Sequence, residues 1–267
     1  VTAQQSASSR KYKANNTDVR YEVCAGGYSS RLKPAIVFGG VTFNLGKGTI
    51  RAIREVASTA IGDIAAGGFA GIITADDTSL DKNTSVMAGS ISNLTVKFSR
   101  FSSVEASCYS FDSNDGDRSG SGKQSRFGNN VYSGGVLGAV IRYDYLSGIK
   151  AEYDSSVSGN NPSGFFVRSV NNAFTGNEDL KGEGYTGGTF GFVLDTRLKD
   201  IEITGNEAAR SLVYFESSHS PNTASVGGLI GAIWAKRRTV SGTDAMIDGA
   251  EISHIQVVGQ AYSGTQS

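Results

Sequence analysis

The sequence predicts an all-β fold, a parallel β-solenoid with irregular long loops and one short amphipathic α-helix. Three observations lead to this prediction. A glycine-led block occurs four times, an alternating apolar stretch follows each block, and the composition is rich in glycine and poor in proline. Of 267 residues, 35 are Gly and only 3 are Pro, whereas ordinary chains contain about 7% Gly and about 5% Pro. Scarce proline fits a fold whose backbone N–H groups are all needed for sheet ladders.

The four blocks align without gaps at residues 67–74, 134–141, 187–194 and 227–234. Each begins with two glycines, has two further residues and then a third glycine, and is otherwise almost wholly apolar. A glycine pair permits a sharp corner, including backbone with φ above zero. A glycine inside a strand removes a side chain where another backbone approaches closely. The repeat glycines are therefore assigned a structural role: Gly67, Gly68, Gly71, Gly134, Gly135, Gly138, Gly187, Gly188, Gly191, Gly227, Gly228 and Gly231.

The second stretch of each unit, at residues 91–98, 146–153, 198–203 and 252–257, has apolar residues mainly at alternate positions. This period is typical of a strand with one buried face. The blocks themselves are apolar on both faces, which is typical of strands covered on both sides. Units that cannot bury their own apolar faces must stack on one another. The sequence therefore predicts successive coils about 4.8 Å apart, joined by connections of unequal length.

Three segments outside the repeat are assigned separately. Apolar residues from Ile50 to Ile64 fall at helical spacing after Thr49, which predicts an amphipathic helix over 50–61 ending near Gly62. Residues 35–43 resemble a degenerate fifth copy around Gly39 and Gly40. Residues 1–20 have no apolar periodicity, and we expect an extended N-terminal arm before a single solenoid domain over 21–267.

The glycine pair followed by two residues and a third glycine resembles the GLUG repeat, which is found in bacterial surface adhesins and in non-catalytic parts of secreted immunoglobulin-A peptidases. The resemblance covers the four blocks and their partner stretches. It implies a β-solenoid that is secreted or at the cell surface, with an adhesive or structural role.

Composition and motifs indicate few reactive sites. The chain has 25 basic and 25 acidic residues, which disfavours a nucleic-acid partner. No apolar run is long enough for a membrane-spanning helix, and no cofactor is expected. A metal site is not expected either, since the loop with Asp112, Asn114, Asp115 and Asp117 departs from a calcium-binding pattern and is only a weak candidate. Cys24 and Cys108 either form a disulfide, in an oxidising compartment, or remain buried thiols.

Aromatic residues near the ends of repeat strands form a candidate binding surface for a glycan or a protein, or else cap the apolar edge of a coil. The chain has only two histidines, His219 and His254, and the sequence places neither beside a Ser and a carboxylate. No catalytic triad is therefore expected. N-glycosylation sequons occur at Asn15, Asn83 and Asn93 and matter only in a glycosylating host. The aromatic candidates are Tyr143, Tyr145, Tyr153 and Trp234.

The prediction is a non-enzymatic extracellular module for cell-surface adhesion, or for self-assembly with identical subunits into a filament or layer. A polysaccharide-processing enzyme is the first alternative, because Asp144, Glu152 and Asp154 could lie on one exposed side. A viral or phage structural subunit is the second alternative.

Overall fold

The computed structural model describes residues 1–6, 23–32, 37–55, 63–74, 87–108, 130–154, 164–171, 183–217, 224–235 and 247–261. These residues form 21 strands, and this part of the chain contains no helix. The strands build four parallel sheets whose members stack in register. The predicted all-β parallel solenoid is therefore confirmed.

The chain visits the four sheets in a fixed order, which we number I to IV. Sheet I contains β2 (Val23–Gly26), β6 (Ile64–Gly67), β10 (Val131–Gly134), β14 (Gly184–Gly187) and β18 (Ala224–Gly227). Sheet II contains β3 (Ser29–Leu32), β7 (Ala70–Thr74), β11 (Leu137–Ile141), β15 (Phe190–Leu194) and β19 (Ile230–Trp234). Sheet III contains β4 (Val37–Gly46), β8 (Met87–Phe98), β12 (Tyr143–Tyr153), β16 (Arg197–Thr204) and β20 (Ile247–Ser253). Sheet IV contains β1 (Thr2–Ser6), β5 (Thr49–Glu55), β9 (Ser103–Cys108), β13 (Phe166–Asn171), β17 (Ser211–Ser217) and β21 (Ile255–Ala261).

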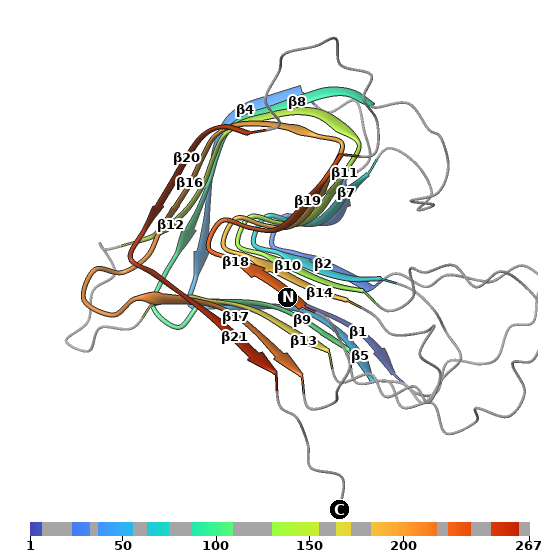
Figure 1. Ribbon diagram of the computed structural model, residues 1–267, viewed down its shortest axis with the longest axis vertical. Helices are drawn as coiled ribbons and strands as arrows, with labels where there is room; N and C mark the ends of the chain where they lie inside the picture. The colour runs from blue at the N-terminus through green and yellow to red at the C-terminus, as the bar shows by residue number, and fades with distance from the viewer. Residues whose placement is uncertain are drawn as a thin grey trace, which may run out of the picture.

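One passage through sheets I, II, III and IV makes a rung, and the described strands form five rungs, with β1 as an additional strand beside β5. Sheets I and II meet at an acute corner that points toward sheet III, while sheets III and IV wrap around the outside (Figure 1). The main apolar core contains residues from all four sheets. A second cluster contains buried residues of sheets I and II only. Strands of sheets I and II are thus buried on both faces, as their apolar runs predict.

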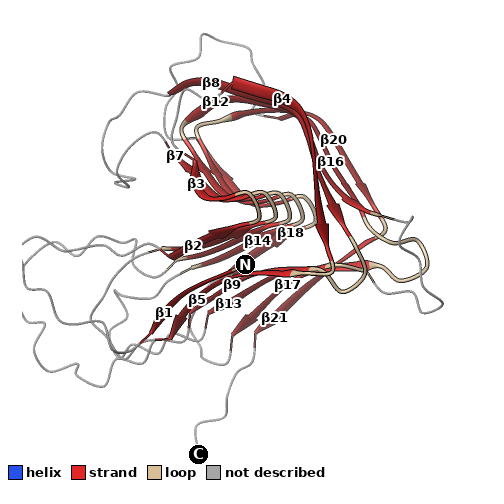
Figure 2. Cartoon of the chain, turned by 180° about the vertical axis from the view of Figure 1, so that it is seen from behind, coloured by secondary structure: helices blue, strands red, loops and turns tan. Residues whose placement is uncertain are grey.

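The corners between sheets I and II are the repeat glycine pairs, and they stack behind one another along the solenoid (Figure 2). None of these glycines has a positive φ, so the expected use of left-handed backbone is wrong here. Glycine is required at these corners because there is no room for a side chain. A Cβ on Gly68 would lie 2.1 Å from the Gly135 carbonyl oxygen of the following rung and close to Val96 and Phe98 of sheet III.

The third glycine of each block faces the preceding rung. A Cβ on Gly138 would lie 2.4 Å from the carbonyl oxygen of Gly71 and 2.7 Å from that of Ala66. Gly191 and Gly231 meet the backbone of their preceding rungs at similarly short distances. Since real Cβ atoms do not approach backbone atoms so closely, the rungs pack at this spacing only with glycine here.

We expect Gly138→Ala to destabilise the protein by about 3 kcal/mol, because the added methyl group overpacks the contact between rungs 2 and 3. Gly259→Ala is the matched control, since a Cβ on this strand glycine meets nothing within 4 Å. Urea unfolding followed by circular dichroism measures both changes. Equal stabilities of the two variants would contradict this role of Gly138.

Sheet III is bent by one residue per rung with left-handed backbone. These residues occupy equivalent positions between registered pairs of neighbouring strands. Glycine, asparagine and aspartate are the residue types that adopt this conformation most readily. The column, which we call the bend column, consists of Gly40, Asn93, Gly148, Asp200 and Gly249, with φ between 52° and 81°.

The expected helix over 50–61 is wrong where the structure describes it. Residues 49–55 form β5, which pairs in parallel with β1 on one side and β9 on the other. Ile50 and Ala52 are fully buried while Arg51 between them is exposed, so the period is that of a strand. Two sheet ladders and a buried face override the helical spacing. Residues 56–61 of the expected helix lie outside the described part.

Two further assignments differ from the structure. The fifth copy of the glycine block is Gly26 and Gly27 between β2 and β3, whereas residues 37–46 form β4 in sheet III. The equivalent of 198–203 in rung 5 is 247–252, because Leu198 pairs with Ile247. The stretch 252–257 instead crosses the corner at His254, whose φ is 55°. Within the expected N-terminal arm, Thr2–Ser6 form β1.

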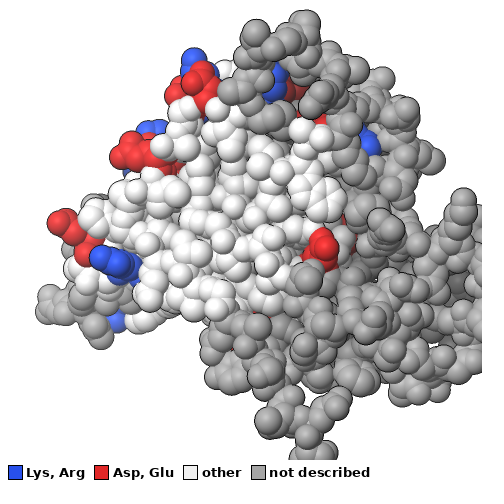
Figure 3. Space-filling model, viewed as in Figure 1, with Lys and Arg blue, Asp and Glu red and all other residues white. Residues whose placement is uncertain are grey.

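Rung 5 ends the described stack with its apolar columns exposed. Val257 is 45% exposed, although Val213, Val167 and Val104 in the same column are fully buried. Ile252 is 52% exposed above the buried Ile203. Figure 3 shows this end of the solenoid, with charged groups gathered along the rim and a largely uncharged centre.

Candidate functional site

The four aromatic residues singled out in the sequence do not form one surface. Tyr143 is buried in the main core, and Tyr153 packs against it. Tyr145 lies beside Arg197, whose guanidinium carbon is 5.6 Å from the ring centroid. Trp234 packs edge-on against Phe192 in the second cluster, at 5.2 Å between ring centroids. Tyr143 and Trp234 therefore contribute mainly to packing.

Two of the carboxylates considered for polysaccharide cleavage, Glu152 and Asp144, pair with cations on sheet III. Glu152 lies 2.9 Å from the Lys97 ammonium group, and Asp144 lies 3.0 Å from the Arg197 guanidinium. Hydrogen bonding to Glu152 and its charge raise the pKa of Lys97. Glu152 and Asp144 thus each pair with a base of an adjacent rung.

The two cysteines lie in different sheets. Cys24 lies in β2 of sheet I and Cys108 in β9 of sheet IV, and no disulfide joins them. Residues 112–117 and His219 lie outside the described part. Among the described residues no group of three or more His, Cys, Asp or Glu side chains is placed to hold a metal ion. No helix within those residues could cross a membrane.

A polar network lies at the edge where the chain passes from sheet IV to sheet I, and we call it the edge network. Asp63, Asn130 and Glu183 each precede a registered strand of sheet I, so they occupy the same position in rungs 2, 3 and 4. Tyr132 and Tyr185 are each the second residue of their strands, and their rings stack with centroids 5.6 Å apart.

Hydrogen bonds link these five residues across three rungs. The Asn130 amide donates to the Tyr132 hydroxyl at 3.1 Å, and this hydroxyl lies 3.5 Å from a carboxylate oxygen of Asp63. The backbone N–H of Glu183 donates to the Asn130 side-chain oxygen at 2.9 Å, and the Tyr185 hydroxyl donates to the Glu183 carboxylate. The network therefore fixes the residues at which three connecting segments enter the solenoid.

Burial shifts the pKa of Tyr132 in the edge network. Complete burial raises the pKa of Tyr132 well above its usual value, and the nearby negative charge of Asp63 raises it further. The neutral phenol is thus the form that the folded protein prefers. Since the unfolded chain loses this proton at lower pH, folding stability is complete below about pH 10 and falls as the pH rises above it.

We expect Tyr132→Phe to flatten the loss of stability at alkaline pH, because the variant has no phenol to ionise at this buried position. At neutral pH the variant is less stable than the wild type, since Asn130 and Asp63 lose a partner. Unfolding free energies measured from pH 8 to pH 11 check the slope. An alkaline slope identical to that of the wild type would show that Tyr132 does not govern it.

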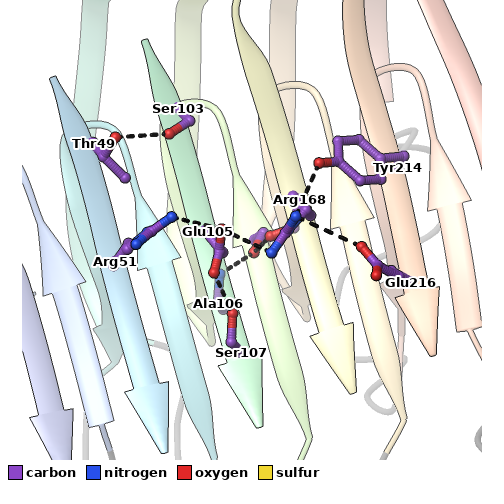
Figure 4. A network of polar contacts seen from close by, with 10 residues as sticks. Thr49, Arg51, Ser103, Glu105, Ala106, Ser107, Arg168, Tyr214 and Glu216 are labelled. Carbon is purple, nitrogen blue, oxygen red and sulfur yellow. Dashed lines mark hydrogen bonds and ion pairs between the residues drawn. The ribbon is translucent and has the colours of Figure 1, made fainter. Parts of the chain in front are cut away.

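A second network crosses sheet IV, and we call it the sheet IV ladder (Figure 4). The register places Arg51, Glu105, Arg168 and Tyr214 side by side on four successive strands. Glu105 is only 6% exposed and lies 3.6 Å from Arg51 and 3.2 Å from Arg168. Its other oxygen accepts a hydrogen bond of 2.6 Å from Ser107. The carboxylate thus has cations on both sides.

Arg168 extends the ladder toward rung 4. Its guanidinium donates to the Tyr214 hydroxyl at 3.3 Å and lies 3.6 Å from the carboxylate of Glu216. Burial lowers the pKa of Arg168, but the hydrogen bond to Tyr214 and the charges of Glu105 and Glu216 outweigh burial and raise it. Two nitrogens of the Arg168 guanidinium thus join rungs 2, 3 and 4, while its buried Nε has no hydrogen-bond partner among the described residues.

We expect Glu105→Gln to destabilise the protein by about 2 kcal/mol, because a nearly buried carboxylate between two guanidinium groups is replaced by a neutral amide. Asp248→Asn is the control, since its side chain is 71% exposed and lies 3.8 Å from Lys199. That change is expected to cost less than about 0.5 kcal/mol. Thermal and urea unfolding measure the stability of both variants. A loss of stability in Glu105→Gln as small as that of the control would show that the sheet IV ladder does not stabilise the fold.

Sequence reasoning singled out none of the residues in these two networks. Their signal is positional: a carboxylate or carboxamide precedes three sheet I strands, and a charged residue stands between small apolar residues in β9. Comparison of the chain with protein-family models, with curated proteins and with solved structures gave no match.

Proposed function

We propose that the chain is a non-enzymatic structural module of a secreted or cell-surface protein, and that it displays adhesive segments from one edge of a β-solenoid. The observation that carries the proposal is the position of its most variable connections. In successive rungs the chain passes from sheet IV to sheet I through residues 56–63, 109–130, 172–183 and 218–223. Because both sheets are in register, these four connections start and end along the same edge (Figure 1).

The edge network supports a displaying role. It fixes the return points of the first three connections, because Tyr132 donates to Asp63, Asn130 donates to Tyr132, and Tyr185 donates to Glu183. The longest connection is also polar, with Asp, Asn, Ser, Gly, Lys and Arg predominating between residues 112 and 126. Variable polar segments on a rigid scaffold are a common arrangement for binding surfaces. The resemblance to GLUG repeats favours the same role.

The charge arrangement favours a scaffold over an enzyme. Lys150 lies 2.5 Å from Glu202, and comparable pairs join Lys97 to Glu152 and Arg197 to Asp144. In each case a base of one rung meets an acid of the adjacent rung. Catalysis would instead call for acids that converge on a substrate with separated pKa values. These described charges serve to hold rungs together.

Self-association is a second candidate function, and the rung 5 end favours it. Among the described strands, β18 to β21 each have a neighbour on one side only, and Ile252 and Val257 are exposed. Unpaired edges with apolar neighbours are natural sites for strand addition. Identical subunits could associate through this end without involving the sheet IV to sheet I edge.

The test replaces residues 112–126 with a short Gly-Ser linker and measures binding of the purified chain to an array of immobilised glycans. We expect the unmodified chain to bind a subset of glycans and the variant to bind at least about tenfold more weakly, with unchanged thermal stability. Replacing residues 238–244, which connect sheet II to sheet III, is the matched control and should leave binding intact.

Three outcomes would count against the proposal. Equal binding by both variants would place adhesion elsewhere on the molecule. New reducing ends released from the glycans would favour the polysaccharide-processing alternative. Failure to bind any glycan, together with multimers in light scattering that Val257→Lys dissociates, would favour self-association through the rung 5 end.

A further inference from the structure

The bend column contains one residue with a chemical possibility beyond its backbone role. Asn93 begins the sequence Asn93-Leu94-Thr95, which is an acceptor motif for N-linked glycans. Its side chain is exposed, whereas Leu94 points into the main core. Thr95 lies on the same side of β8 as Asn93 and is half-buried. The two side chains that the motif requires thus share the solvent side of sheet III.

The neighbours of Asn93 leave room for a bulky group. The adjacent members of the bend column are Gly40 in rung 1 and Gly148 in rung 3, and neither has a side chain. A Cβ added to Gly40 would meet nothing within 4 Å. A Cβ added to Gly148 would meet mainly Asn93 itself, at 2.6 Å from its side-chain oxygen. The carboxamide therefore lies over a surface free of neighbouring side chains in its own column.

The backbone at Asn93 is also suited to the modification. Its φ of 52° places the residue at the bend of sheet III rather than in the regular ladder. The register resumes on both sides, with Ser92 paired to Ser147 and Leu94 paired to Ile149. A group attached to the side chain would therefore displace no ladder hydrogen bond. A glycan needs such a position, since it is bulky and must stay in solvent.

We propose that Asn93 is an N-glycan acceptor whose glycan the folded solenoid accommodates at the bend of sheet III. The co-reactant is a polyprenyl-pyrophosphate-linked oligosaccharide, used by an oligosaccharyltransferase. The Asn93 Nδ2 atom forms a bond to C1 of the first sugar and loses one proton. The bond from C1 to the pyrophosphate oxygen breaks, and the lipid pyrophosphate leaves with the electron pair.

The inference goes beyond the proposed adhesive role and does not depend on it. It requires passage through a glycosylating secretory pathway, which the experiment supplies by adding a signal sequence. The sequons at Asn15 and Asn83 lie outside the described part, so both are removed in the test. Removal of Asn83 is essential because trypsin releases Asn83 and Asn93 on one peptide, from Asn83 to Lys97.

The experiment secretes the Asn15→Gln, Asn83→Gln chain from eukaryotic cells and treats the folded product with peptide-N-glycosidase. We expect a loss of mass and conversion of Asn93 to aspartate in the tryptic peptide. The glycosylated and deglycosylated chains should give the same β-rich circular dichroism spectrum and melting temperatures within a few degrees.

Matched variants separate the acceptor role from the bend. Asn93→Asp removes the acceptor but keeps a residue type that Asp200 already provides at the equivalent position of rung 4. Thr95→Val removes the hydroxyl group with little change of shape, while Thr95→Ser keeps it. We expect the first two variants to be folded and unglycosylated and the third to be glycosylated.

Two results would overturn the proposal. In one, the Asn15→Gln, Asn83→Gln chain is secreted and folded with no glycan at Asn93. In the other, glycan at Asn93 appears only in material that lacks the β-rich spectrum, which would show that the solenoid does not accommodate it. The attachment of a glycan to Asn93 does not depend on whether the chain binds immobilised glycans in the adhesion test. Each proposal can therefore be overturned without the other.

Discussion

The close approach of backbones at the corner between sheets I and II sets the geometry of the whole solenoid. Each third glycine faces the preceding rung, and the second glycine of each pair faces the following one. Glycine is no longer required at the two ends of the described stack. In rung 1, Ser30 takes the position of the third glycine, and no described rung precedes it in sheet II. In rung 5, a Cβ on Gly228 would meet no atom closer than 3.3 Å. The spacing at this corner positions every strand that follows, including those that carry the two polar networks.

Much of the fold was predictable because this steric requirement leaves a repeated pattern. The four blocks from Gly67 onward were recognised and lie in successive rungs. The first copy was missed because Ser29, Ser30 and Arg31 replace the apolar and glycine positions at the end of the stack. The strands of sheet IV were missed or misassigned because they lie outside the glycine blocks, and β5 has isoleucines that also fit helical spacing. Pairing with β1 and β9 decides its structure, and a single sequence does not reveal such long-range ladders.

The polar networks were harder to predict than the fold because their members are far apart in sequence. Glu105 contacts Arg51 and Arg168 only because three rungs are in register. Asp63, Asn130 and Glu183 likewise form one column only because the strands that follow them are in register, although the connections before them differ in length. For the same reason, the sequence does not reveal that Tyr143 and Trp234 belong to different clusters. Composition identifies residue types, whereas the stacking of rungs decides which of them meet.

The shared edge of the sheet IV to sheet I connections also bears on how such a chain can change over generations. An insertion at that edge leaves every ladder in register, whereas one extra residue inside a strand would turn its buried side chains outward. Doubling the length of a flexible connection costs only about 0.6 kcal/mol of closure entropy. Variation can therefore accumulate at one margin of the molecule while the stacked body stays fixed.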